Sequence, residues 1–443
     1  MSENKTRNND RFWKNLRGLG RWFVPGLGVK RWFLLVLLGI TLLGVGLAIF
    51  LLDLYRTDST NPILLTILSY ASLRFLPRVL RVVVFAGLGI GLVAYGIWQL
   101  NRSLLRPYLR PGRAVVEDLE NFRRRERGPR IVAIGGGHGL ATLLRGLKAY
   151  TRNLTAVVTV ADDGGSSGRL RESFGILPPG DIRNCLAALS NDEQMLTQLF
   201  QYRFSGAGNL DGHSFGNLFI TALAEITGSF ESAIAESGKV LSVGGRVLPS
   251  TLHNVKLVAD MQLPHSLNQV RVEGESRIPQ MQGRVQRVWL EPNDASAYPP
   301  VIRALLNADM IVVGPGSLYT SLLPNLLVHD LLGALRASRA LKVYVSNIAT
   351  QKGETDLYSC HDHVRVLEEH VGDRLFDVVL CNDNYTGKLL DDSQWVQVDE
   401  KSLADGRVRC ADLADAGYPW RHDSKKLADV LMSILAERTA PLE

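Results

Sequence analysis

Two long apolar runs near the amino terminus dominate the hydrophobic pattern of the chain. The run Phe33–Leu52 contains no charged residue, and about 20 apolar residues is the length that a helix needs to cross a bilayer. A second run, Val82–Leu100, carries Tyr95 and Trp98 near its end, and these aromatic types settle at headgroup depth. The pattern predicts a transmembrane helical hairpin over residues 32–101, with spans at about 33–52 and 82–100.

Basic residues flank this predicted hairpin on both sides. They precede it in segment 1–31 and follow it from residue 102, whereas the connecting loop is basic mainly at Arg74, Arg78 and Arg81. Because short cytoplasmic segments carry the excess of lysine and arginine, both ends belong inside. A secretory signal peptide is the alternative for the first run, but that run is long and a second span follows it. We therefore expect a multi-pass protein of the inner membrane whose amino terminus and remaining chain lie in the cytoplasm.

Composition refines this interpretation. The chain has 443 residues and a formal net charge of +6, but many of its basic residues lie before residue 31 or between 102 and 130. That placement favours anionic lipid headgroups and argues against nucleic acid as a partner. The polar stretch 102–129 is interpreted as a juxtamembrane linker, and the short apolar stretch 63–73 as an interfacial segment. The four cysteines show no C-x-x-C spacing and are expected to be reduced and structural.

From Arg130 the pattern changes to that of an α/β domain, predicted over residues 130–440. An apolar strand, IVAI, meets the glycines of GGGHG, and LATLLRGLKAY then has the spacing of a helix. Glycines let the backbone approach a phosphate closely, and the start of a helix offers unpaired N–H groups to an anion. The spacing departs from G-x-G-x-x-G because Leu140 takes the place of the last glycine, and such a turn can also be only a turn.

The next β-branched run ends abruptly in the string ADDGGSSGR. Ligands of a parallel sheet bind beyond the carboxyl ends of its strands, so Asp162 and Asp163 indicate a site for ribose, metal or phosphate. A solvated Asp-Gly turn that caps a helix is the alternative. Successive strand residues point to opposite faces, so we expect one of the two carboxylates to face a ligand, with a preference for Asp163.

Five further motifs place polar residues at strand ends or helix starts. The string PPGDIRN puts Asp181 at the start of a helix, where a capping role explains it, and in GHSFGN a capping role explains Ser214. A second strand, turn and helix unit, MIVVGPGSLYTSLLPNLLV, carries Gly316 and Ser317 at its turn. The strand VYVSN ends in Asn347. Near the carboxyl terminus Arg421 either clamps a phosphate or is a surface residue beside a helix cap at Asp423.

Together these strings resemble the gluconeogenesis-factor (YvcK) family over nearly all of residues 130–435, in the order and spacing of that family. The resemblance rests on GGGHGLATLLRGLK, VVTVADDGGSSGRLR, LPPGDIRNCL, GHSFGNL, GPGSLYTSLLPNLLV, YVSNIATQKGET and WRHDSKKLA. It implies a doubly wound, mostly parallel, Rossmann-like α/β fold related to the 2-phospho-L-lactate transferases. The membrane hairpin is an addition to the common family pattern.

The family resemblance also implies a function and a set of site residues. It implies a regulator that binds UDP-sugars, notably UDP-N-acetylglucosamine, and that influences cell-envelope synthesis, cell shape and growth on gluconeogenic carbon sources. The motif positions that would line the nucleotide cleft are Gly136, Gly137, Asp163, Ser167, Asn217, Gly316, Ser317, Asn347 and Arg421. No catalytic residue and no metal ligand is assigned. Candidate partners are the nucleotide sugar, the membrane, a cell-envelope enzyme and a second copy of the chain as a homodimer.

Two other functions compete with that of a binding regulator. The first is a Mg²⁺-dependent transferase that moves a phosphate-linked group from a nucleotide donor, with Asp163 holding the metal. The string GGSSGR departs from the transferase relatives after the Asp pair, which favours binding over catalysis. The second is a nicotinamide oxidoreductase, which the broken glycine motif disfavours. Cys360, His361 and His363 lack a second ligand pair and are interpreted as core or surface residues, not as a zinc site.

Overall fold

The computed structural model describes residues 30–54, 76–105, 125–190, 195–206, 208–263, 268–281, 283–372 and 374–439. The chain divides into two compact units, Met1–Leu119 and Glu120–Glu443. The predicted basic segment 1–31, the interfacial stretch 63–73 and the linker 102–129 lie largely or wholly outside the described residues.

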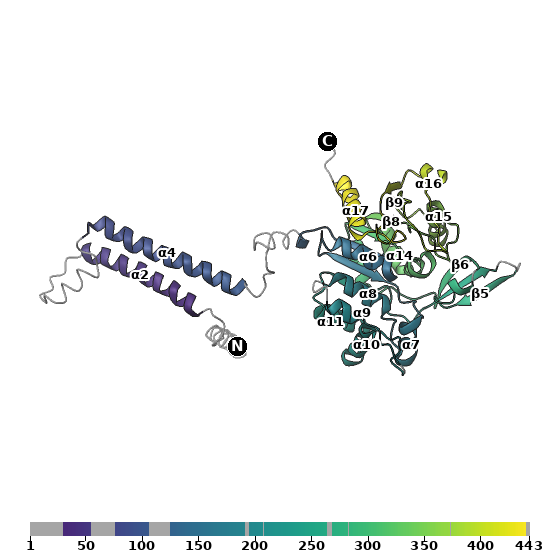
Figure 1. The fold of residues 1–443 in the computed structure, drawn as a ribbon, viewed down its shortest axis with the longest axis horizontal. Coiled ribbons are helices and arrows are strands. Elements are labelled where there is room, and N and C mark those ends of the chain that lie inside the picture. Colours follow the sequence, from purple (N-terminus) through teal and green to yellow (C-terminus); the bar gives the residue numbers. More distant parts are fainter. Residues whose placement is uncertain are drawn as a thin grey trace, which may run out of the picture. The chain divides into compact units, whose positions relative to one another are not determined.

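The first unit contains two long helices, α2 (Lys30–Leu54) and α4 (Arg78–Leu105), which pack against each other (Figure 1). Glycines bring the two backbones close, because a Cβ at Gly39 would lie 2.9 Å from Val93 Cγ2 and one at Gly46 would lie 3.0 Å from Phe85 Cβ. Small residues allow this close approach between apolar helices. By length and composition one described helix, α4 with its window Val83–Leu100, could cross a membrane, whereas the described apolar part of α2 is shorter.

The second unit is built on a seven-stranded sheet. Its strands are β1 (Ile131–Gly135), β2 (Leu154–Val158), β3 (Arg246–Pro249), β7 (Met310–Val313), β8 (Leu341–Val345), β9 (Val378–Asn382) and β10 (Val408–Ala411). Their order is β10-β9-β8-β7-β1-β2-β3, and every pairing is parallel. The central strands are buried along their whole length, which explains why they read as continuous apolar runs and not as alternating ones.

Helices cover this sheet. Those between β1 and β3 are α6 (Gly137–Leu147), α7 (Gly165–Phe174), α8 (Gly180–Leu189), α9 (Met195–Gln201), α10 (Phe215–Thr227) and α11 (Phe230–Val240). Those from β3 to the carboxyl terminus are α12 (Pro299–Leu306), the π-helix η3 (Leu318–Leu322), α13 (Leu323–Leu326), α14 (His329–Ala337), α15 (Cys360–Val371), α16 (Glu400–Ala404) and α17 (Ser424–Thr439). Helix α6 packs against α8 and α17, and α12 packs against α14. The predicted doubly wound α/β fold is confirmed.

The chain order reverses direction between β1 and β7. Strands β1, β2 and β3 step toward one edge of the sheet, and β7, β8, β9 and β10 step toward the other. Because the crossovers between parallel strands are right-handed, such a reversal distributes the helices over the two faces and opens a crevice beyond the carboxyl ends of β1 and β7.

A smaller antiparallel sheet was not predicted from the sequence. It contains β4 (Lys256–Gln262), β5 (Gln269–Glu273) and β6 (Arg284–Glu291), in the order β5-β4-β6, and it projects from the main sheet (Figure 1). A short 3-10 turn, Pro279–Met281, lies between β5 and β6. We call strands β4 to β6 with their connections the arm.

The cysteines differ in part from expectation. Cys360, at the start of α15, and Cys381, in the neighbouring strand β9, form a disulfide, so the expectation of four reduced thiols is wrong for this pair. The packing of β9 beside α15 brings together two residues that are 21 positions apart in the sequence, which the spacing alone does not show. Cys185 is a buried free thiol and Cys410 an exposed one.

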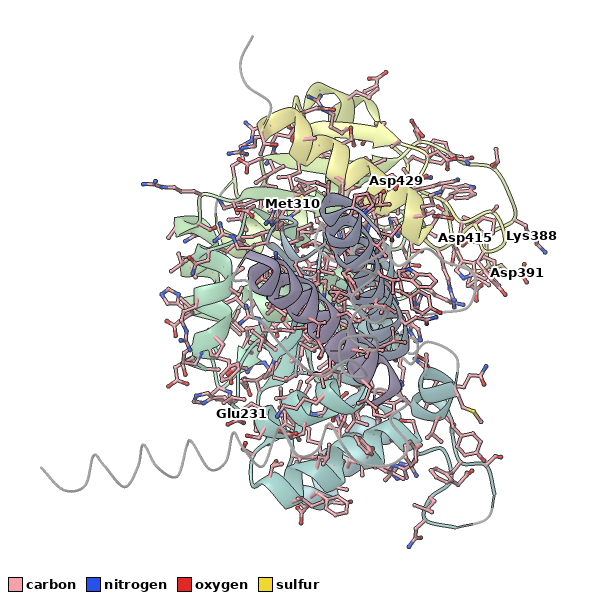
Figure 2. All side chains as sticks on the ribbon, turned by 90° about the vertical axis from the view of Figure 1, so that its left-hand side faces the viewer. Glu231, Met310, Lys388, Asp391, Asp415 and Asp429 are labelled. Atoms are coloured by element: carbon pink, nitrogen blue, oxygen red, sulfur yellow. A yellow bond between two sulfur atoms is a disulfide. The ribbon has the colours of Figure 1, made fainter. Side chains whose placement is uncertain are left out.

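Two charged side chains that stand out from the second unit are Lys388 and Asp391, on the loop that follows β9, with side chains 88% and 91% exposed (Figure 2). Apolar side chains fill the space between sheet and helices, where the strands and the inner faces of α6, α8, α14 and α17 form one buried cluster.

The contact between α6 and α17 depends on a glycine. A Cβ at Gly146 would lie 1.9 Å from the Ser424 carbonyl oxygen and 2.8 Å from Ala428 Cβ. We predict that Gly146→Ala lowers the free energy of unfolding of the fragment Glu120–Glu443 by about 1–3 kcal/mol in urea titrations, because the helices must separate. Gly333, in α14, has open space at its Cβ position, so Gly333→Ala should instead stabilise the fragment by about 0.5–1 kcal/mol. Equal effects of the two substitutions would contradict the close contact.

Candidate functional site

Two glycine loops cross at the point where the strand order reverses. Gly136 forms the turn after β1 and Gly139 lies in the first turn of α6, whereas the loop after β7 contains Pro315 and Gly316. A Cβ at Gly139 would lie 2.4 Å from the Pro315 carbonyl oxygen, so no side chain fits between the loops there. At Gly136 a Cβ would lie 2.6 Å from Asp181 Oδ2. These glycines are required by close approach, and their backbone is left open to a ligand.

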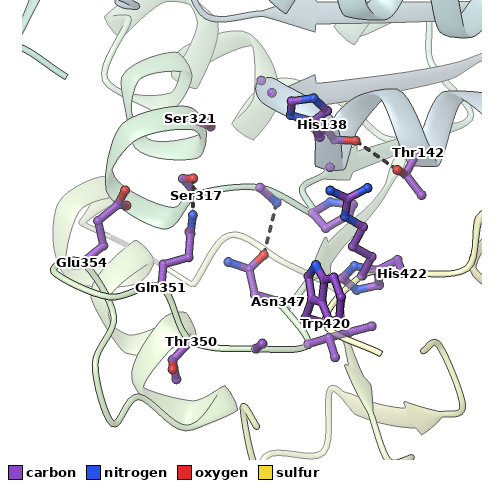
Figure 3. A pocket seen from close by; sticks show the side chains of 18 of the residues that line it. His138, Thr142, Ser317, Ser321, Asn347, Thr350, Gln351, Glu354, Trp420 and His422 are labelled. Carbon is purple, nitrogen blue, oxygen red and sulfur yellow. Dashed lines mark hydrogen bonds between the residues drawn. The ribbon is translucent and has the colours of Figure 1, made fainter. Parts of the chain in front are cut away.

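A cleft of about 680 Å³ opens above the crossing loops (Figure 3). Its size falls within the range of ligand pockets, roughly 300–1,000 Å³. The residues that line it come from the loops after β1, β2, β7 and β8, from the start of α8, from the arm, and from the segments before α16 and α17. The cleft lies beyond the carboxyl ends of the strands, where a doubly wound sheet binds its ligands.

The structure brings most of the residues predicted from motifs into the wall of this cleft. The lining includes Gly136, Gly137, Gly316, Ser317, Asn347 and Arg421. Asp163, Ser167 and Asn217 are not among the lining residues, and Asp162 lines the cleft in place of Asp163. The sequence preference for Asp163 is therefore corrected, because the turn after β2 directs the carboxylate of Asp162 to the cleft.

The three predicted residues outside the wall connect neighbouring loops. Asp163 Oδ1 accepts a hydrogen bond of 2.9 Å from the Ser276 N–H in the arm. Ser167 Oγ accepts one of 3.1 Å from the Gly180 N–H. Asn217 Nδ2 donates one of 3.1 Å to Ser166 Oγ. In the structure these side chains support the loops that carry the lining residues.

The three capping interpretations have different outcomes. Asp181 is not a helix cap, since α8 follows Pro179 and no side chain caps it; the Asp181 carboxylate instead faces the cleft and accepts a hydrogen bond from the Gly137 N–H. Ser214 does cap α10 by accepting from the Asn217 N–H. At α17, Asp423 Oδ1 accepts from the Lys425 and Lys426 N–H groups, which confirms the cap beside Arg421.

One end of the cleft is basic. Arg145 and Arg421 line it together with His138, whose carbonyl oxygen accepts a hydrogen bond of 3.0 Å from Thr142 Oγ1 (Figure 3). Burial, and then the positive charges led by Arg421, lower the pKa of His138, so its imidazole is neutral at pH 7. The Arg421 guanidinium also lies 5.5 Å from the centre of the Tyr418 ring. This end can receive an anion.

The other end collects carboxyl groups from distant parts of the chain, Asp162, Glu275 and Glu354, and Asp181 adds a fourth at the start of α6, where it binds the Gly137 N–H. Burial and the neighbouring Asp162 raise the pKa of Asp181 to about 6. Burial and the charges of Asp162, Asp181, Glu354 and Asp163 raise the pKa of Glu275 to about 8. Burial raises the pKa of Glu354 to about 7, although Thr320 Oγ1 donates a hydrogen bond of 3.1 Å to it. At neutral pH Glu275 is therefore protonated and Glu354 partly so, and these two groups can donate as well as accept hydrogen bonds.

Amide groups hold the wall between these two ends. Asn347 Oδ1 accepts a hydrogen bond of 3.2 Å from the Gly316 N–H, and Gln351 Nε2 donates one of 2.8 Å to Ser317 Oγ (Figure 3). Gln351 Oε1 and Glu354 Oε2 are buried in the cleft wall without a partner in the protein. A ligand that supplies hydrogen-bond donors, such as hydroxyl groups, would satisfy both.

Several lining residues were missed from the sequence. Thr142 and Arg145 lie one and two helical turns after His138, so helical spacing could have indicated them. Glu275 and Trp420 gave no comparable signal, because the arm that carries Glu275 was not predicted and Trp420 stands in a loop. Among the described residues no group of three or more histidine, cysteine or acidic side chains is arranged to hold a metal ion.

Comparisons with known proteins agree with this architecture. The family model "2-phospho-L-lactate transferase CofD" matches residues 131–414. A Nostoc sp. protein provisionally named a gluconeogenesis factor is 44% identical over 438 residues, covering 93% of this chain and 91% of its own. The gluconeogenesis factor of Listeria monocytogenes is 44% identical over 322 residues, covering 71% of this chain and 98% of its own.

A solved structure shows the same fold. The crystal structure of a UPF0052 family protein from Bacillus halodurans has a TM-score of 0.65 and 41% identity, and it covers 69% of this chain and 99% of that protein. These matches confirm the resemblance inferred from the motifs. The chain belongs to the gluconeogenesis-factor (YvcK, UPF0052) family, whose α/β domain is of the 2-phospho-L-lactate transferase type.

Proposed function

We propose that the chain is a membrane-anchored regulator that binds a nucleotide sugar of the UDP-N-acetylglucosamine type and adjusts cell-envelope synthesis and cell shape during gluconeogenic growth. The observation that carries the ligand assignment is the separation of charge in the cleft. Arginines and a neutral histidine occupy one end, and partly protonated carboxyl groups occupy the other.

The two ends match the two halves of a nucleotide sugar. A diphosphate requires cations and a helix start, which Arg145, Arg421 and the first turn of α6 supply, apart from the Gly137 N–H that binds Asp181. A sugar requires hydrogen-bond partners for its hydroxyl groups, which Glu275, Glu354 and the amide oxygen of Gln351 supply. Trp420 lines the cleft close to Asn347 and His422 (Figure 3) and offers an aromatic face for the nucleotide base.

In this proposal the domain binds the nucleotide sugar, and its role is regulatory because no chemical step is assigned to it. The level of an activated sugar reports how much precursor the cell has for its envelope, and related proteins carry the name gluconeogenesis factor. A ligand that binds one conformation of the domain more tightly shifts its population. In our proposal the shifted state recruits or releases an enzyme of envelope synthesis.

A transferase is the second candidate, favoured by the family description and by the four coupled carboxyl groups. Mg²⁺ would be its cofactor, with Asp162 as the candidate ligand from the predicted Asp pair, and the phosphates would then lie nearer to the carboxyl groups than in the regulator proposal. Incubation of the protein with a nucleotide sugar, Mg²⁺ and candidate acceptors decides between the two proposals. Turnover would replace the regulator by the transferase.

We predict that UDP-N-acetylglucosamine binds the fragment Glu120–Glu443 in isothermal titration and that Arg421→Ala weakens it about 10- to 100-fold, since a charge-assisted hydrogen bond to phosphate contributes about 1.5–3 kcal/mol. Arg339→Ala, a change of the same charge outside the cleft lining, is the control and should bind as the unaltered fragment does. Absence of binding to any UDP-sugar would remove the ligand assignment.

We predict that the ligand-free fragment becomes less stable as the pH rises from about 5 to 8. Carboxyl groups with a raised pKa keep their protons in the folded state when the unfolded chain has lost them, so stability is greatest at low pH and falls through the folded-state pKa values of about 6, 7 and 8. Glu275→Gln should flatten the decline of the unfolding temperature above pH 7. Glu273→Gln, at an exposed position of β5, should leave it unchanged; the same slope in all three proteins would contradict the assignment.

The membrane part of the proposal rests on the apolar helix pair and its basic flanks. Outward side chains of both helices are apolar and exposed, including Leu37 at 51% and Ile90 at 61%. We predict that a reporter enzyme fused after Glu443 is active only as a cytoplasmic fusion and that the full chain fractionates with membranes. An extracytoplasmic reporter would overturn the predicted topology.

A further inference from the structure

A second cavity, of about 700 Å³, lies at the edge of the sheet opposite the cleft. Its walls are the amino-terminal ends of β1, β2 and β3 together with one side of α12. Four arginines line it: Arg130, Arg152, Arg246 and Arg303. The described residues of its lining include no carboxylate, and Asn153, Thr155 and Asn307 are its other polar side chains. We call this cavity the arginine pocket.

The charge of the arginine pocket is only partly neutralised within the protein. The Arg130 guanidinium forms an ion pair of 2.8 Å with Asp309. Arg246 Nη2 donates a hydrogen bond of 3.3 Å to the uncharged Thr155 Oγ1. Arg246 and Arg303 are both exposed, and neither forms an ion pair with any residue that the structure describes. Two guanidinium groups are therefore free to bind an external anion.

The position of the pocket in the chain indicates which anion it meets. Arg130 is the residue through which the chain enters β1, and residues 106–129 connect this entry to the end of α4. A connection of that length spans at most about 85 Å even when fully extended. The edge of the sheet with the arginine pocket is therefore the edge at which the chain from α4 enters the second unit.

We infer that the arginine pocket binds the phosphate groups of anionic lipids and so docks the second unit on the cytoplasmic surface of the bilayer. This inference rests on the membrane anchor of the proposed function, but not on the identity of the ligand in the cleft. The negative potential of the cytoplasmic leaflet attracts arginines that lie within a Debye length of it. Because the strands are parallel, docking at their amino ends leaves the cleft at their carboxyl ends open to the cytoplasm.

The test is sedimentation of the fragment Glu120–Glu443 with vesicles. The solved relative from Bacillus halodurans, 99% of which is matched by 69% of this chain, shows that the domain folds without the hairpin. We expect binding to vesicles of phosphatidylglycerol and phosphatidylcholine, weakening as salt is added, and none to phosphatidylcholine alone. The double variant Arg246→Gln/Arg303→Gln should bind about 25-fold more weakly, since each basic residue contributes about fivefold.

The matched control is Arg287→Gln/Lys401→Gln, which removes the same charge from exposed positions on the arm and on α16. It should bind vesicles as the unaltered fragment does. An equal loss of vesicle affinity in both double variants would mean that net charge attracts the fragment, and it would overturn the inference that the arginine pocket binds lipid. Displacement by inorganic phosphate at the lipid phosphate concentration would show a site for soluble phosphate and would also overturn the inference. Single substitutions Arg246→Gln and Arg303→Gln, with unfolding temperatures, cover the case in which the double variant fails to fold.

Titration of the same proteins with UDP-N-acetylglucosamine separates this inference from the proposed function. Vesicle binding that persists without nucleotide-sugar binding would support the arginine pocket and remove the proposed ligand. Nucleotide-sugar binding by a fragment that does not bind anionic vesicles would support the proposed ligand and overturn the inference about the arginine pocket.

Discussion

The cleft depends on the close crossing of the two glycine loops at the reversal of strand order. There the backbone of Gly139 passes the carbonyl group of Pro315 at a distance that admits no side chain. The crossing is held from below by Asn325, whose Nδ2 donates to the carbonyl oxygens of Gly135 and Ser321, and from the side by Asn347, which binds the Gly316 N–H. Because these loops are fixed, three parts of the chain lie around one cavity: the start of α6, the carboxylate of Asp181 and the π-helix η3.

The parts of the fold that depend on local sequence pattern are predictable from the sequence. The buried parallel strands follow from continuous apolar runs, and the loops with Gly136 and Gly316 follow from glycines between a strand and a helix. The arm was missed because β4, in KLVADMQ, pairs with strands up to 35 positions away, and such pairing leaves no trace in the spacing of one segment. The sequence also does not show which carboxylate faces the cleft, Asp162 or Asp163. That depends on a distant contact, because Asp163 binds the Ser276 N–H in the arm.

The motifs of the family serve two physical tasks, and a sequence does not separate them. Asn347 and Arg421 line the cleft, whereas Asp163, Ser167 and Asn217 bind the loops behind it. Both tasks require polar residues at strand ends and helix starts, so both produce the same kind of string. The buried carboxyl groups that line the cleft come from four separate segments, so no single motif contains them.

The arm supplies one wall of the cleft although it is an insertion between β3 and α12. It contributes Glu275 and Pro279, and Gly353 fits against the Pro279 carbonyl oxygen only because it has no side chain. The other lining residues of the cleft come from the loops and helices of the main sheet. The arm is therefore a part of the cleft wall whose sequence and length can change while the strand order of the main sheet stays the same.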